Sequence, residues 1–156
     1  MTSGRDAYDC VFCAKVKNKD EADVIFLDDV SMVFLDNHPL FFGHSLVIPK
    51  EHFRNMFDVS YDTLCELSKR VKLVSLAVKS AMHSDGVLVI TNTEISQSIP
   101  HMHIHVIPRK RGDGLRGFMW PRHRYESVGH MVKTRNLIKE ALGNAIKESG
   151  FSPASQ

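Results

Sequence analysis

The stretch from Pro100 to Arg109, PHMHIHVIPR, restricts the fold of this chain more than any other. Histidines at 101, 103 and 105 alternate with apolar residues at 102, 104 and 106. Side chains alternate between the two faces of a β-strand, so the pattern predicts a strand with three imidazoles on one face and an apolar row on the other. Buried imidazoles each need a hydrogen-bond partner, which makes a purely structural role the weaker interpretation. Metal binding and chemistry on a substrate are favoured.

The overall composition is that of an ordinary globular protein. The chain has 156 residues, 43% hydrophobic and 24% charged, enough for one domain with a sizeable core. Its formal net charge of +2 gives no reason to expect a nucleic-acid partner. It has no apolar run of about 18 residues and no signal-peptide pattern at its start. We therefore expect a cytoplasmic protein without a membrane partner.

Two of the three cysteines form a C-x-x-C motif, Cys10 and Cys13. In a cytosolic chain this motif is half of a zinc site, a redox pair or two buried thiols, and metal binding is the favoured interpretation. No second C-x-x-C exists, so further ligands have to come from elsewhere in the sequence. Cys65 falls beside the apolar stripe of a predicted helix and is expected to be a small buried thiol.

Hydrophobic periodicity predicts four further strands and two long helices. The strands are expected at 24–28, 32–36, 44–49 and 87–90, and the helices after Ser60 and within 127–149. Asp28 and Asp29 form a turn signal, so the first two strands should be an antiparallel hairpin. Ser60 can cap the first of the two helices, and Gly86 is expected to supply a left-handed residue at its end.

With these elements the chain resembles the histidine triad (HIT) family of nucleotide hydrolases and transferases. The likeness covers roughly residues 9–110: the triad itself, the block from Phe34 to Lys50, and the Gln-Ser pair just before the triad. It implies an α+β fold, with an antiparallel sheet of about five strands and two long helices. The whole chain, 1–156, is expected to be one HIT-like domain, its core at about 9–110 and an extension with a helix at 111–150.

The resemblance implies a role for each polar residue of the site. His103 corresponds to the nucleophile, and His105 corresponds to the histidine beside it that binds the phosphate. His44 corresponds to the fourth histidine of the site. Substrate contacts are implied for Asp36, at the ribose hydroxyls, and for Asn92, Gln97 and Ser98, at the phosphates. Glu94, Ile95 and Ser96 stand where family members often carry glycines, so we expect the phosphate loop to be shaped differently here.

Some family members that carry the N-terminal cysteine pair bind structural zinc. On that pattern the ligands in this chain are Cys10, Cys13, His52 and His101. Two thiolates and two imidazoles suit a closed tetrahedral zinc site. Neither a catalytic metal nor an organic cofactor is expected.

The resulting functional prediction is a nucleotide hydrolase. It would cleave a dinucleoside polyphosphate, or a related nucleoside phosphate derivative, at the α-phosphate through a nucleotidyl-histidine intermediate. The alternatives are a nucleotidyltransferase or phosphorylase of the same family and a non-catalytic nucleotide-binding module. The presence of all three of His44, His103 and His105 speaks against the last.

A homodimer is also expected. One sheet with two long helices leaves a helix stripe and a sheet edge to be covered, and symmetric dimers are the commonest solution. Residues 112–125 are basic and glycine-rich at first and then contain Phe118, Met119 and Trp120. We expect this segment near the mouth of the active site.

Overall fold

The computed structural model describes residues 10–18, 23–115 and 123–149. They fall into two compact units, one ending at Asp113 and the other beginning at Gly114. The first unit contains a five-stranded sheet with helices α2 (Val11–Lys17) and α3 (Tyr61–Ala81), and the second contains α4 (Val128–Ser149). The α+β class, the sheet of five strands and the two long helices are therefore confirmed, whereas α2 was not predicted.

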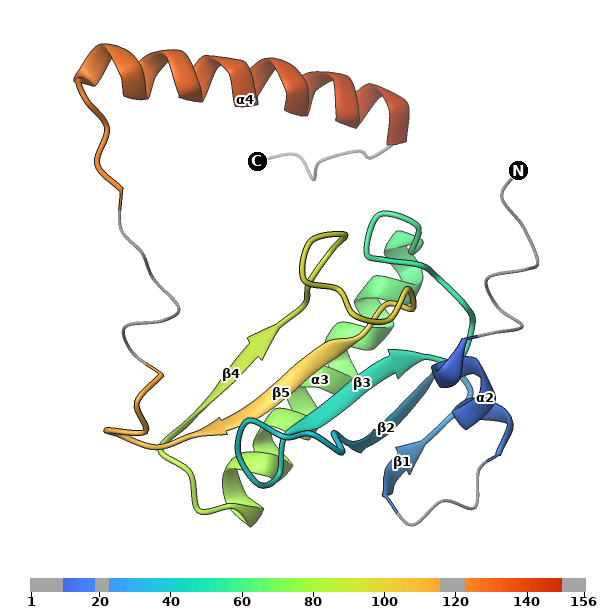
Figure 1. Cartoon of the computed structure of the whole chain (residues 1–156). Helices are drawn as coiled ribbons and strands as arrows, with labels where there is room; N and C mark the ends of the chain where they lie inside the picture. Colours follow the sequence, from blue (N-terminus) through green and yellow to red (C-terminus); the bar gives the residue numbers. More distant parts are fainter. Residues whose placement is uncertain (1–9, 19–22, 116–122, 150–156) are drawn as a thin grey trace. The chain divides into compact units, whose positions relative to one another are not determined.

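The sheet is antiparallel throughout, with the strand order β1-β2-β3-β5-β4 (Figure 1). Its strands are β1 (Val24–Leu27), β2 (Ser31–Leu35), β3 (Ser45–Pro49), β4 (Gly86–Ile90) and β5 (Ile104–Arg109). Strand β5 begins three residues later than the histidine pattern suggested. Just before it, the amide of Met102 donates to the carbonyl of Phe53, 2.7 Å away, outside the sheet.

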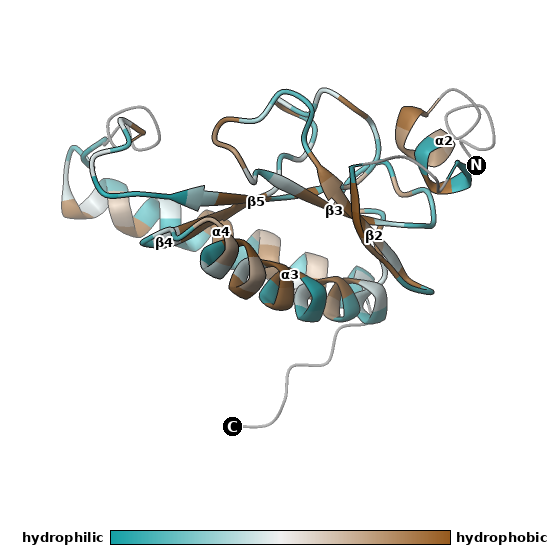
Figure 2. Ribbon diagram, turned by 90° about the horizontal axis from the view of Figure 1, so that it is seen from below, coloured by the Kyte–Doolittle hydropathy of each residue, from teal (hydrophilic) through white to brown (hydrophobic). Residues whose placement is uncertain are grey.

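Each face of the sheet carries its own apolar cluster, because neighbouring residues of β2 and β3 point to opposite sides. On one face, Val33 and Val47 pack with the buried side of α3, and the apolar row at 102, 104 and 106 joins them as expected. On the other face, Phe34 and Ile48 pack with Phe12 of α2. Figure 2 shows α3 beneath the sheet, with α2 on the opposite side.

Helix α3 begins as the sequence predicted and ends differently. The hydroxyl of Ser60 accepts a hydrogen bond from the amide of Thr63, 3.2 Å away, which caps the helix. At the other end the left-handed residue is His83, with φ of 49°, while Gly86 already belongs to β4. Cys65, expected to be buried, is exposed on α3. The helix positions beside an apolar stripe can face water, and Cys65 occupies one of them.

Helix α4 forms where a second long helix was predicted. The amide of His130 donates to the hydroxyl of Ser127, 3.0 Å away, at its start. No residue of α4 is buried. Among the described residues, no helix is both long and apolar enough to span a membrane.

Candidate functional site

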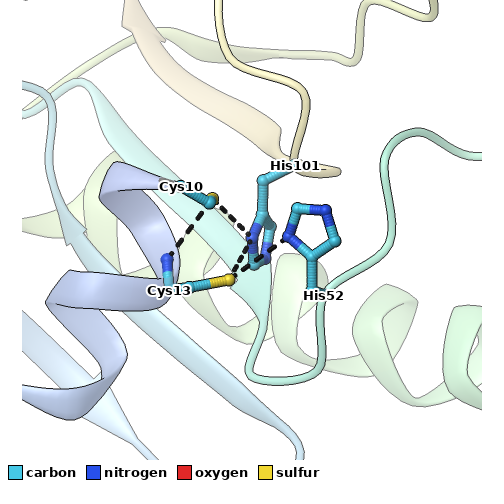
Figure 3. Close-up of side chains that lie close together, drawn as sticks. All are labelled: Cys10, Cys13, His52 and His101. Carbon is cyan, nitrogen blue, oxygen red and sulfur yellow. Dashed lines mark hydrogen bonds between the residues drawn. The ribbon is translucent and has the colours of Figure 1, made fainter. Parts of the chain in front are cut away.

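The two cysteines of the C-x-x-C motif meet two histidines from distant parts of the chain (Figure 3). Cys10 caps the N-terminus of α2, Cys13 lies in that helix, His52 follows β3, and His101 precedes β5. The Nδ1 atom of His101 lies 3.4 Å from Sγ of Cys10 and 3.5 Å from Sγ of Cys13. The Nδ1 atom of His52 lies 3.2 Å from Sγ of Cys13. All four donor atoms lie within 4.8 Å of one another, so the cluster can hold a metal ion.

The protonation chemistry of this cluster suits a cation. His101 is fully buried, and its Nε2 donates to the carbonyl oxygen of Pro49, 2.9 Å away, which leaves the Nδ1 lone pair directed at the sulfurs. Burial lowers the pKa of His101 to about 4, so the ring is neutral at pH 7. Burial and the neighbouring Cys10 raise the pKa of the Cys13 thiol to about 11, so a metal that binds there displaces its proton.

The donor atoms are also spaced as ligands of one ion. Zinc bonds of about 2.0 to 2.3 Å place tetrahedral ligand atoms about 3.3 to 3.8 Å apart. The three separations given above fall within or close to this range. His52 differs from His101 in one respect: its Nε2 is buried and has no hydrogen-bond partner among the described residues.

His103 is oriented as a nucleophile has to be. Its ring is buried, and its Nδ1 lies 2.7 Å from the carbonyl oxygen of His101. A carbonyl oxygen only accepts, so Nδ1 carries the proton and the lone pair lies on Nε2. No hydrogen bond to Nε2 of His103 is present within the part of the chain that the structure describes. A neutral imidazole with a free Nε2 is able to attack an electrophile.

A pair of histidines, His44 and His105, lies beside His103. The ring centroids of His103 and His105 are 4.9 Å apart, and Nε2 of His44 lies 2.9 Å from Nδ1 of His105. The amide of Leu40 donates to Nδ1 of His44, 3.3 Å away, so Nε2 of His44 is the nitrogen that carries a proton. It donates to His105, whose own proton therefore lies on Nε2. This chain of hydrogen bonds leaves His105 with an N–H donor for an anion.

Both of these histidines are held neutral. Burial lowers the pKa of His105 to about 4, helped by the nearby charges of His103 and His44 when these are protonated. Burial also lowers the pKa of His44, against the carboxylate of Asp36, whose oxygen lies 3.6 Å from Nδ1 of His44. The other carboxylate oxygen of Asp36 accepts from the amide of His38 at 2.8 Å. Asp36 therefore borders the histidine pair, at the end of β2.

The loop between β4 and β5 contains the three polar residues expected to contact phosphates. The side chain of Gln97 ties the loop together: its amide donates to the carbonyls of Arg54 and Ile99, and its oxygen accepts from the amide of Glu94. Asn92 donates to the carbonyl of Ser96, 3.2 Å away, and Ser98 is exposed. In this arrangement Gln97 and Asn92 shape the loop.

Two non-glycine residues of this loop have left-handed backbones. Glu94 has φ of 66° and Ser96 has φ of 60°, angles that glycine adopts without strain. They stand where family members often carry glycines, which was the reason to expect a differently shaped phosphate loop. The loop thus takes up a backbone conformation of the glycine type at some cost in strain.

Three residues, Phe12, Thr91 and Leu40, make contacts in the site that were not foreseen from the sequence. Phe12 packs edge-on against the rings of both His101 and His103. The hydroxyl of Thr91 donates to the carbonyl oxygen of His103, 2.8 Å away, and the amide of Leu40 orients His44. Phe12 lies inside the C-x-x-C motif, which could have drawn attention to it. Thr91 and Leu40 belong to no sequence motif that points to the site. The residues Phe118, Met119 and Trp120, expected near the site, lie outside the described residues.

Comparisons with known proteins identify a family model and relatives that match the chain. The family model described as HIT domain matches residues 17–112. An uncharacterised HIT-like protein of Saccharolobus solfataricus is 36% identical over 101 residues, which cover 64% of this chain and 73% of the relative. Adenylylsulfatase HINT3 of Arabidopsis thaliana is 37% identical over 109 residues, 69% of this chain but only 55% of HINT3. The chain therefore matches about half of that relative's length.

A solved structure carries a metal. The zinc-bound histidine triad family protein from Mycobacterium smegmatis superposes with a TM-score of 0.65 at 32% identity, covering 74% of this chain and 86% of that one.

Proposed function

The chain belongs to the HIT family, and on that basis we propose that it cleaves nucleoside phosphate derivatives at the α-phosphorus, with Nε2 of His103 as the nucleophile. The observation that carries this proposal is the 2.7 Å contact between Nδ1 of His103 and the carbonyl of His101, which leaves Nε2 unprotonated. Membership of a family of nucleotide-related enzymes and the relation to HINT3 support the general class of reaction.

In the proposed mechanism His103 forms a covalent bond to phosphorus. The Nε2 lone pair attacks the α-phosphorus and the group on the far side of that phosphorus departs, giving a nucleotidyl-histidine. The N–H of His105, set by His44, donates to a non-bridging oxygen as negative charge builds there. Water then attacks the same phosphorus, releases a nucleoside monophosphate and restores His103.

The substrate proposed is a nucleotide with a good leaving group on its α-phosphate. A dinucleoside polyphosphate is the class expected from the sequence, and adenylyl sulfate, the substrate class that the name of HINT3 states, belongs to the same chemistry. Asp36 is proposed to bind the ribose hydroxyls, and Asn92, Gln97 and Ser98 to line the phosphate side. We also propose a homodimer in the cytoplasm.

We propose zinc as the metal of the cysteine–histidine cluster. Cys10, Cys13, His52 and His101 would hold it, and their chemistry and spacing support this assignment, as does the zinc-bound relative. Four protein ligands close the coordination sphere, so the ion would supply folding free energy rather than catalysis.

The experiment that tests the proposed function is steady-state hydrolysis of a panel containing diadenosine tetraphosphate, adenylyl sulfate and an adenosine phosphoramidate. His103→Asn should lower kcat at least about a thousandfold on every substrate that the wild type uses. The matched control is His83→Asn: His83 is exposed and lies outside the site, and asparagine tolerates its left-handed backbone. Equal activity of the two variants would remove His103 from the mechanism.

A further inference from the structure

Phe12 links the metal cluster to the nucleophile. It is one of the two residues between Cys10 and Cys13, and its side chain is buried, with 7% of its surface exposed. Its ring centroid lies 5.5 Å from that of His103, at an interplanar angle of 82°, and 5.8 Å from that of His101. Edge-to-face contacts of this kind favour one orientation of each ring.

Helix α2 cannot fix the position of Phe12 by itself. It has seven residues, and helices this short are unstable in isolation because nucleation is costly. Within the described residues α2 is anchored by Cys10 and Cys13 at the cysteine–histidine cluster and by Phe12 in the apolar cluster with Phe34. Lys15 adds an ion pair, with its Nζ 2.9 Å from a carboxylate oxygen of Asp23. The cysteines are the anchors nearest to Phe12 along the chain, so the position of its ring depends in part on how firmly they are held.

A second connection runs through His101. Its Nδ1 faces the two sulfurs, while its carbonyl oxygen accepts a hydrogen bond from Nδ1 of His103. The cysteine–histidine cluster is thus connected to the ring of His103 by two contacts, the hydrogen bond to the carbonyl of His101 and the edge-to-face contact with Phe12.

We propose that Phe12 is a positioning residue, which holds the imidazole of His103 in its attacking orientation when Cys10 and Cys13 are bound to metal. This inference rests on the proposed function of His103 and extends it to the regulation of the same site. The fraction of protein with metal bound at the cysteine–histidine cluster determines the fraction in which the His103 ring has the attacking orientation. Loss of the metal releases the cysteine anchors of α2 and moves the ring of Phe12 away from His103. The imidazole of His103 is then able to rotate.

The matched variants are Phe12→Leu and Phe34→Leu. Both residues are buried aromatics of the same apolar cluster, with ring centroids 5.3 Å apart, and both variants keep an apolar side chain. Of these two described residues, Phe12 alone has ring contacts with His101 and His103. Phe12→Leu should lower kcat about tenfold while KM stays within about twofold, because a displaced nucleophile costs rate rather than binding. The two variants should lower the melting temperature by similar amounts. Phe34→Leu, however, should leave kcat within about twofold of the wild-type value.

A spectroscopic measurement tests the proposal without turnover. In ¹⁵N-labelled full-length protein loaded with zinc, the two ring nitrogens of His103 should report a single tautomer protonated at Nδ1. Either Phe12→Leu or removal of zinc should give averaged nitrogen shifts, and the two changes together should have little more effect than one alone. Metal content should remain one per chain in Phe12→Leu.

Three results would overturn the proposal. They are an unchanged His103 tautomer in Phe12→Leu, equal losses of kcat in the two leucine variants, and a Phe12→Leu effect confined to KM, which would make Phe12 a substrate contact. A wild type that turns over no nucleotide would contradict the proposed function instead, and the tautomer measurement would still decide the role of Phe12.

Discussion

The Nδ1 atom of His103 lies 2.7 Å from the backbone carbonyl oxygen of His101, two residues earlier. The ring of His101 belongs to the cysteine–histidine cluster, and its backbone carbonyl orients the ring of His103. The two histidines therefore have different contacts, and this hydrogen bond joins the cysteine–histidine cluster to the ring of the proposed nucleophile. The predictions below follow from this arrangement.

Metal binding should depend on the cysteines of α2 and not on cysteine in general. Cys13→Ser should lose the metal, from one ion per chain to less than about 0.1, because serine is a poor zinc ligand. The lost binding energy should lower stability by about 3 kcal/mol, or roughly 10 °C in melting temperature. Elemental analysis and calorimetry of protein prepared without chelator measure both. Cys65→Ser, changed at an exposed position of α3, is the control and should match the wild type. Wild-type protein without metal would refute the assignment.

The neutral state of His105 should make the protein sensitive to acid. Its pKa is about 4 in the folded chain and 6.5 in the unfolded reference, so the unfolded chain takes up the proton first as pH falls. The contribution of neutral His105 to the free energy of unfolding is fully present above pH 6.5 and is lost as the pH falls from 6.5 to about 4. His105→Gln should reduce the loss over this window by about 2 kcal/mol. Urea unfolding of the wild type and of His105→Gln at pH 7, 5.5 and 4.5 measures the difference. If the free energy of unfolding falls equally with pH in both proteins, His105 does not titrate in this way.

The left-handed backbone of Glu94 should make glycine favourable there. Glu94→Gly relieves the strain at φ of 66°, so the substitution should be neutral or stabilising by up to about 1 kcal/mol. The control is Ile95→Gly in the same loop, at an exposed residue without a left-handed backbone, which should destabilise by about 0.5 to 1 kcal/mol. Equal losses of unfolding free energy would mean that Glu94 bears no strain.

Thr91 should matter for rate because its hydroxyl holds the backbone of the nucleophile. Thr91→Val keeps the shape of the side chain and removes the 2.8 Å hydrogen bond to the carbonyl of His103. We expect kcat to fall about three- to tenfold with little change in KM, and Thr91→Ser to restore most of the activity. If valine and serine variants have the same kcat, the hydrogen bond does not position His103.

The fold could be predicted from the sequence wherever buried apolar residues recur at the spacing of a strand or a helix. Alternation at residues 101–106 placed Met102, Ile104 and Val106 in the core against α3, and the four other strands were found within a residue or two. The stripe of α3 was equally clear. Its flank was not: Cys65 sits beside the stripe and faces water, a distinction that helical period alone does not make.

The site was only partly predictable, because its contacts come from loops that have no period. The clustering of Cys10 and Cys13 with His52 and His101 was expected through the family resemblance rather than from spacing. Helix α2 was missed, since seven residues anchored by a cluster of ligands carry little helical signal of their own. The contacts of Phe12, Thr91 and Leu40 depend on tertiary packing, and no local pattern announces them.

The measurement that tests the central claim most directly is mass spectrometry of the protein quenched during turnover. Wild-type protein mixed with diadenosine tetraphosphate and stopped within milliseconds should gain the mass of one adenylyl group, located on the peptide that contains His103. The adduct should be labile in acid, as a phosphorus–nitrogen bond is, and His103→Asn should lack it. Substrate consumption without any adduct on His103, or an adduct that persists in His103→Asn, would contradict the account.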